Sequence, residues 1–154
     1  MAFFEPSKDV IDWIDGKFSD TGLDNFVQLK VLGVSKQSQI FNVSRASSLV
    51  KYIGNLDDDA VVITVYEEAF DRLDEATREL LIDDALAQIG WDGEKDKLIV
   101  EKPKINVTIG ARRKHGEALI NAAETSIAVI EAIEEEEKDR KAAAKEAKKN
   151  KKRG

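Results

Sequence analysis

The spacing of apolar residues within residues 59–103 predicts the centre of the fold. Residues 60–65 are almost entirely apolar and mostly β-branched, which is typical of an interior strand covered on both faces. After this strand, Phe70 and Leu73 are the apolar residues of a short charged run. Their spacing indicates one brief helical turn with its apolar side turned inward.

A longer amphipathic helix should follow, with Asp74 as its N-cap and Gly90 at its end. The wide apolar face of this helix predicts burial of Ala76, Leu80, Leu81, Ala85, Leu86 and Ile89. The chain then returns as a strand with its apolar centre at residues 98–100, and Pro103 ends that strand.

The first part of the chain predicts smaller elements. A narrow apolar stripe at helical spacing indicates a short N-terminal helix, which Gly16 should end; the stripe consists of Val10, Trp13 and Ile14. Residues 26–34 and 39–43 have strand patterns on either side of a polar turn, which predicts a β-hairpin. Ser44 is a suitable N-cap for a following helix that closes with Gly54 as its C′ residue. The apolar face of that helix should contain Leu49, Val50 and Ile53.

A long helix is predicted to begin around Ala111, with an interruption near Gly116. Its docking face recurs at steps of three and four residues through Leu119, Ala122, Ala123, Ser126, Ile127, Ile130 and Ile133. After Ile133 this face disappears, although helix propensity stays high. The helix should therefore project into solvent and fray at its basic end.

These elements define an α+β fold. We expect a small mixed β-sheet, packed by the central amphipathic helix and the long C-terminal helix, with the basic tail extended. The predicted organisation is an N-terminal helical segment at 1–19, an α+β domain at 20–133, and a charged extension at 134–154 that is partly helical or disordered.

The composition narrows the classes of function. The 154 residues are 42% hydrophobic, which is enough for one domain with a core. Cysteine is absent, and this excludes disulfides, thiolate zinc sites and cysteine nucleophiles. No run approaches the roughly 18 apolar residues of a membrane span, and the N-terminus does not have the pattern of a signal peptide. We therefore expect a cytoplasmic protein without membrane contact.

The charge is distributed unevenly along the chain. Residues 138–154 contain nine basic and two acidic residues, a net charge of +7, although the whole chain carries −6. Residues 1–137 contain 15 basic and 28 acidic residues, a net charge of −13. An acidic body with a basic tail is not a general nucleic-acid surface, so phosphate contacts are expected mainly from the tail.

Three segments resemble a known family: residues 36–55, residues 60–103 and GARRKHG at 110–116. The order of elements, and WDGEKDKLIVEKP after the central helix, are similar to a widespread family of uncharacterised tailed-phage proteins. That family resembles in layout the phage proteins assigned as metallopeptidases of the zincin type. The resemblance implies a phage origin and a location in the host cytoplasm.

A zincin needs H-E-x-x-H on a helix, because two histidines one turn apart bind zinc and the glutamate activates water. Two registers of that motif fit the central helix, at Asp83, Asp84 and Ala87 or at Asp84, Ala85 and Gln88. Alanine occupies an essential position in both registers. His115 is the single histidine of the chain. We therefore expect neither a metal, nor another cofactor, nor catalytic residues, and no peptidase activity.

Two basic segments are the candidate binding residues. The first precedes the long helix and consists of Arg112, Arg113, Lys114 and His115. It could contact phosphate or an acidic partner, or it could neutralise nearby acids such as Asp83 and Asp84. The second is the tail, with Lys145, Lys148, Lys149, Lys151, Lys152 and Arg153. It is either a solubilising helical extension or an electrostatic clamp on nucleic acid or an acidic partner surface.

The leading hypothesis is a non-enzymatic phage accessory protein that binds a protein of the transcription, replication or counter-defence machinery. Its basic tail would contact nucleic acid nearby. The alternative is a stand-alone nucleic-acid-binding protein that uses the tail and residues 112–114. A third hypothesis is an enzyme with a degenerate zincin-like site of carboxylates and metal around Glu68, Asp83 and Asp84. The pattern leaves the oligomeric state open.

Overall fold

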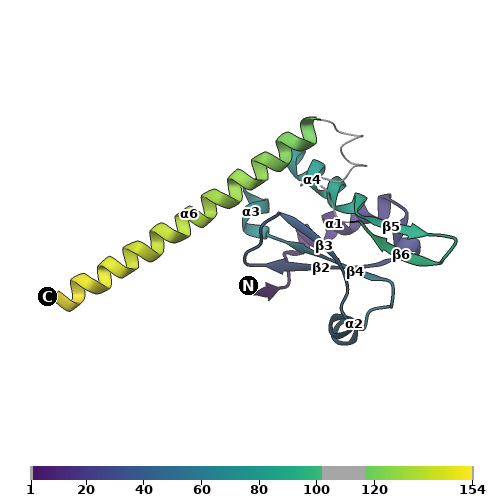
Figure 1. Ribbon diagram of the computed structural model, residues 1–154, viewed down its shortest axis with the longest axis horizontal. Coiled ribbons are helices and arrows are strands. Elements are labelled where there is room, and N and C mark those ends of the chain that lie inside the picture. The colour runs from purple at the N-terminus through teal and green to yellow at the C-terminus, as the bar shows by residue number, and fades with distance from the viewer. Residues whose placement is uncertain (1, 102–116, 154) are drawn as a thin grey trace.

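The structure of the chain is a computed structural model that describes residues 2–101 and 117–153. Side chains are described as far as Lys151. It has the predicted α+β architecture, with a mixed sheet, packed helices and a long C-terminal helix (Figure 1). The predicted residues 102–116, including the region around Pro103 and Ala111, lie outside the described residues.

The main sheet contains four strands among the described residues, in the spatial order β1-β2-β4-β3. Their bounds are β1 Phe3–Phe4, β2 Gln28–Val34, β3 Phe41–Arg45 and β4 Ala60–Val65. Strand β2 runs parallel to β4, and the other two pairs are antiparallel. The predicted interior strand is confirmed, because β4 has a neighbour on each edge and all its residues except Thr64 are buried.

The predicted hairpin is wrong. Strands β2 and β3 do not pair with each other, because β4 lies between them. The polar turn that separates them is held by β4 itself. The Gln37 side-chain amide donates to the Thr64 carbonyl at 3.0 Å, and the Thr64 hydroxyl donates to Gln37 Oε1 at 2.8 Å. The most apolar strand, β4, takes an interior position in which both of its faces and both of its edges are covered.

Helix α1 (Lys8–Asp20) continues past Gly16, so the prediction that Gly16 ends this helix is wrong. The apolar stripe extends one turn further to Phe18, which is buried together with Val10 and Ile14. Burial of Phe18 stabilises the last turn and outweighs the weak helix preference of one glycine. Trp13 is half-buried and makes an edge contact with Phe70, at 5.5 Å between ring centroids. A single turn of 3-10 helix follows at Leu23–Asn25.

Helix α2 (Ser48–Gly54) begins later than predicted. Ser47 caps it by accepting a hydrogen bond from the Val50 N–H at 3.2 Å, whereas Ser44 belongs to β3. Asn55, with φ of 51°, supplies the left-handed residue that was expected at Gly54. The predicted apolar face is also wrong, because Val50 packs against the sheet while the rest of that face is exposed to solvent.

Helices α3 (Glu67–Asp71) and α4 (Glu75–Ala87) agree more closely with the elements predicted from the sequence. Phe70 and Leu73 are buried, and Asp74 caps α4 by accepting a hydrogen bond from the Thr77 N–H at 2.8 Å. Three details of α4 differ from the prediction. Ala76 is exposed, and Leu80 and Leu81 are only half-buried. Ile82 is fully buried because α4 lies between the sheet and another helix.

Gly90 does not stop α4, because the helix ends at Ala87 and Gly90 lies in strand β5 (Ile89–Asp92). The predicted return strand exists as β6 (Lys97–Val100). It pairs with β5 in a separate antiparallel hairpin. The Arg45 guanidinium, which donates to the Leu98 carbonyl at 2.7 Å, connects this hairpin to β3 of the main sheet.

The main core lies on the face of the sheet that α1 and α4 cover. It includes Ile14, Ile63, Ile82 and Ile130, each almost completely buried, so aliphatic side chains dominate it. A smaller cluster on the other face joins α2 to the sheet through Ala46, Ala60, Val62, Val50 and Leu56. Across the described residues, no helix has both the length and the apolar character needed to cross a membrane.

Candidate functional site

Helix α6 (Glu117–Arg153) divides into two halves that have different surroundings. Its inner half, residues 117–137, carries the predicted docking face. Of the seven residues of this face, Ile127 is half-buried. The other six are buried: Leu119, Ala122, Ala123, Ser126, Ile130 and Ile133. This face packs on α4 and α3, so the inner half is a structural part of the body.

The outer half, residues 138–153, leaves the body and extends into solvent as predicted (Figure 1). Every side chain from Lys138 to Lys151 is exposed. The described helix continues to Arg153 without an apolar face, so no packing against the rest of the described chain explains these residues.

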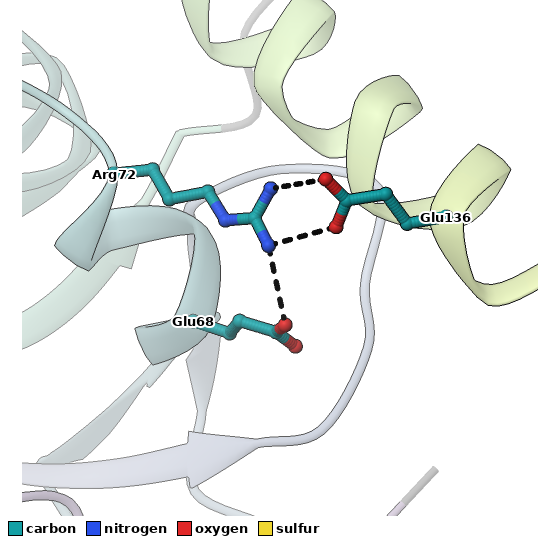
Figure 2. A network of polar contacts seen from close by, with 3 residues as sticks. All are labelled: Glu68, Arg72 and Glu136. Atoms are coloured by element: carbon teal, nitrogen blue, oxygen red, sulfur yellow. Dashed lines mark hydrogen bonds and ion pairs between the residues drawn. The ribbon is translucent and has the colours of Figure 1, made fainter. Parts of the chain in front are cut away.

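An ion-pair network holds α6 where the two halves meet. Arg72, the C-cap residue of α3, makes bidentate hydrogen bonds from its guanidinium to the Glu136 carboxylate, at 3.3 and 2.9 Å. The same guanidinium lies 3.7 Å from the Glu68 carboxylate (Figure 2). The hydrogen bond from Arg72 lowers the pKa of Glu136, and the hydrogen bond to Glu136 raises the pKa of Arg72. The network is partly exposed. It therefore adds only a small contribution to a helix position that the buried face of the inner half already fixes.

The outer half presents a row of lysines. Lys138, Lys141, Lys145 and Lys148 line one surface, with Ala142 and Ala144 between them. Steps of three, four and three residues keep the four lysines on one side of a helix over about 15 Å. We call these four residues the lysine stripe.

The two acids of the outer half do not interrupt this row. Asp139 and Glu146 are seven residues apart, so they share a different side of the helix. Lys141 makes an exposed ion pair with Glu137 at 3.4 Å, at the inner end of the stripe. The arrangement can attract a row of anionic groups by charge.

The structure places the sequence-predicted binding residues unequally. Lys145, Lys148, Lys149 and Lys151 are all exposed on α6. Lys152 and Arg153 belong to the same helix, but their side chains lie outside the described part. Arg112, Arg113, Lys114 and His115 also lie outside the described residues. The prediction missed Lys138 and Lys141, although their spacing relative to Lys145 and Lys148 was the signal that could have found them.

The positions compared with a zincin motif lie on α4 and just beyond it. Asp84 and Gln88 are buried, with 8% and 7% exposure, whereas Asp83 is half-buried and Ala87 is exposed. The register of Asp84, Ala85 and Gln88 therefore faces inward. Asp84 borders an open cavity of about 280 Å³ between α4, α6 and β3, together with Ser126 and Ile127.

A metal site needs several ligands in one place. Among residues 2–101 and 117–153, no three or more histidine, aspartate or glutamate side chains are grouped so that they could hold a metal ion. The comparison of the chain with known proteins adds no ligand set, because no protein-family model, curated protein or solved structure matches it.

Proposed function

We propose that this protein is a non-enzymatic phage accessory protein that acts by binding in the host cytoplasm. Its acidic body docks on a protein of the transcription, replication or counter-defence machinery. The basic outer half of α6 contacts nucleic acid beside that protein. The phage assignment follows from the resemblance in residues 36–55 and 60–103, and the binding role follows from the form of α6.

One observation carries the proposal: the lysine stripe is presented on a helix that stands clear of an acidic body. A duplex carries one negative charge per about 1.7 Å of its axis, so a stripe of about 15 Å passes several phosphates. The body, with a net charge of −13 over residues 1–137, would be repelled by the same duplex. The tail therefore makes the contact and the body stays accessible to a protein.

The contact is expected to be independent of base sequence. The outer half contains no aromatic residue for stacking, and Asn150 is its single side-chain amide. Lysine recognises phosphate as a point charge. Binding should thus depend on the number of phosphates reached and on salt.

The direct test compares two variants of equal charge. In the stripe variant, Lys138, Lys141, Lys145 and Lys148 are changed to Gln. In the body variant, four exposed lysines elsewhere are changed to Gln: Lys8, Lys36, Lys95 and Lys97. Fluorescence anisotropy with a labelled duplex of about 20 base pairs measures affinity between about 0.05 M and about 0.3 M salt. Loss of binding in the stripe variant alone supports the proposal, and equal loss in both variants contradicts it.

The protein partner is tested separately. The full chain and a chain ending at Glu137 are used to capture proteins from phage-infected cells. We expect the same protein with both chains, because the acidic body carries that contact. Recovery of no partner with either chain would count against the docking role.

The lysine stripe also favours a second candidate, a stand-alone nucleic-acid-binding protein, since the stripe needs no protein to reach phosphate. In that case residues 112–114 would add to the tail. Changing Arg112, Arg113 and Lys114 to Gln would then weaken duplex binding further in the stripe variant. Under the leading proposal, this second change leaves duplex binding at the level of the stripe variant.

A further inference from the structure

The most exposed large apolar side chains of the described residues lie together on α2. Tyr52 is 87% exposed, Ile53 74% and Leu49 66%. Their steps of three and four residues place them on one side of the helix. We call these three residues the α2 patch. Contiguous apolar side chains with this exposure are typical of a contact surface.

The α2 patch is held in a fixed orientation. Ser47 caps the start of the helix, and after Asn55 the Leu56 N–H donates to the Lys51 carbonyl at 2.8 Å. On its inner side, Val50 packs with Leu56 against the sheet. Because the inner side is anchored, rotation of α2 cannot bury the patch without breaking these contacts.

Two carboxylates follow the patch closely along the chain. Asp57 and Asp58 are exposed in the turn that follows α2. This turn is fixed to β2, since the Asp57 N–H donates to Gln28 Oε1 at 2.7 Å and the Gln28 N–H donates to the Asp59 carbonyl at 3.0 Å. The surface that fits this arrangement is weakly apolar at its centre and has cations at its edge.

We propose that the α2 patch receives the outer half of α6 from a second copy of this chain. In that outer half, Ala142 and Ala144 lie between the lysines of the stripe. Small side chains allow Tyr52 and Ile53 to approach the helix closely, and the lysine stems add apolar surface. The lysine ammonium groups then face Asp57 and Asp58, so both the apolar and the charged parts are complementary.

The tail that fills the patch cannot come from the same molecule. Helix α2 precedes the start of β4, whereas α3, which contacts α6, follows its end, a separation of about 20 Å along the strand. From there the outer half of α6 points away from the body (Figure 1). Direct pairing of two α2 patches is disfavoured, because it would bring the carboxylates of both copies together.

The contact is therefore heterologous, from the tail of one copy to the patch of the next. It is small and charge-dependent, so it should be weak and sensitive to salt. This inference goes beyond the proposed function and does not rest on it, since no nucleic acid takes part.

Sedimentation velocity of the full chain over a concentration series provides the first test. We expect the average mass to rise with concentration at about 0.05 M NaCl and to return to that of a monomer at about 0.5 M NaCl. A chain that stays monomeric at every concentration at low salt overturns the proposal, whatever its behaviour with DNA.

A mixing experiment then separates this contact from other modes of association. The patch variant carries Tyr52→Ser and Ile53→Ser, and its matched control carries Phe3→Ser and Ile99→Ser at two other exposed apolar positions, 59% and 44% exposed. The patch variant and the stripe variant should each lose association, with a dissociation constant raised at least about tenfold. Mixed together they should form a one-to-one pair, because one supplies an intact tail and the other an intact patch. Association by the stripe variant alone, or no pair in the mixture, contradicts the proposal.

Discussion

The two halves of α6 have the same secondary structure but opposite environments. The inner half buries Leu119, Ile130 and Ile133 against the body, and the outer half buries no described side chain. Helix propensity is high in both, so propensity does not distinguish them. The presence or absence of an apolar stripe does. The comparison teaches that one continuous helix can be structural over one part and available for contact over the next.

The border between the halves is charged on both sides. Residues 134–137 are four consecutive glutamates, and Lys138 begins the basic segment. Arg72 contacts Glu136 at this border and so connects the last acidic turn of the inner half to α3 (Figure 2).

The largest expected effect is on stability from the inner half. Ile130 is 4% exposed, and Ile130→Ala should lower the free energy of unfolding by about 2–5 kcal/mol, through lost burial and the cavity left behind. In the outer half, the exposed Lys145→Ala should stay within about 0.5 kcal/mol of the original chain. Urea unfolding of both variants measures the difference. Equal losses would mean that the outer half also packs on the body.

The next effect is on duplex affinity. The stripe variant removes four cations, so the slope of log affinity against log salt should become shallower by about 3–4. At low salt its affinity should fall at least about tenfold. Its unfolding free energy should be unchanged, which separates loss of contact from loss of fold. An unchanged salt slope would show that the stripe does not meet phosphate.

A smaller effect is expected at the border and depends on pH. Because Arg72 lowers the pKa of Glu136 in the folded chain, their contact stabilises the fold while the carboxylate is charged. This contribution is complete above the ordinary glutamate pKa of 4.5 and is lost as the pH falls below it. Arg72→Gln should therefore be less stable than the original chain at pH 7, with the two converging in acid. A difference that persists in acid would assign Arg72 a packing role instead.

The smallest expected effect concerns metal. Asp84 has no metal role in the proposed function, so zinc and calcium should leave the melting temperature of the full chain unchanged, as should a chelator. Metal-dependent stabilisation that disappears in Asp84→Asn would restore the hypothesis of a carboxylate and metal enzyme. The same change without metal measures how much the buried carboxylate itself contributes to the fold.

The sequence predicted elements whose signals are local and strong. Strand β4, the cap at Asp74 and the buried face of α6 were all predicted from the pattern of apolar residues and from capping chemistry. The hairpin was wrong because pairing is not local: adjacency in sequence favoured β2 with β3, but the more apolar β4 separates them. The prediction for Gly16 was wrong because the apolar stripe continues beyond Val10, Trp13 and Ile14 to the buried Phe18.

The part of the candidate site that depends on local signals was also predicted from the sequence. The charge of the tail and its projection are local properties, so they were visible in the sequence. The exposed side of α2 was not, since an apolar side chain at helical spacing normally indicates a buried face. Only the position of α2 beside the sheet shows that Val50 faces inward and Tyr52 outward.

The most direct test of the account is a scan along α6 with two measurements on each variant, unfolding free energy and duplex affinity. Single changes run from Leu119→Ala in the inner half to Lys148→Gln in the outer half. The account predicts that losses of stability are confined to residues before 138 and losses of affinity to residues from Lys138 onward. If the variants that lose duplex affinity were the same variants that lose stability, with no change of behaviour at residue 138, this result would contradict it.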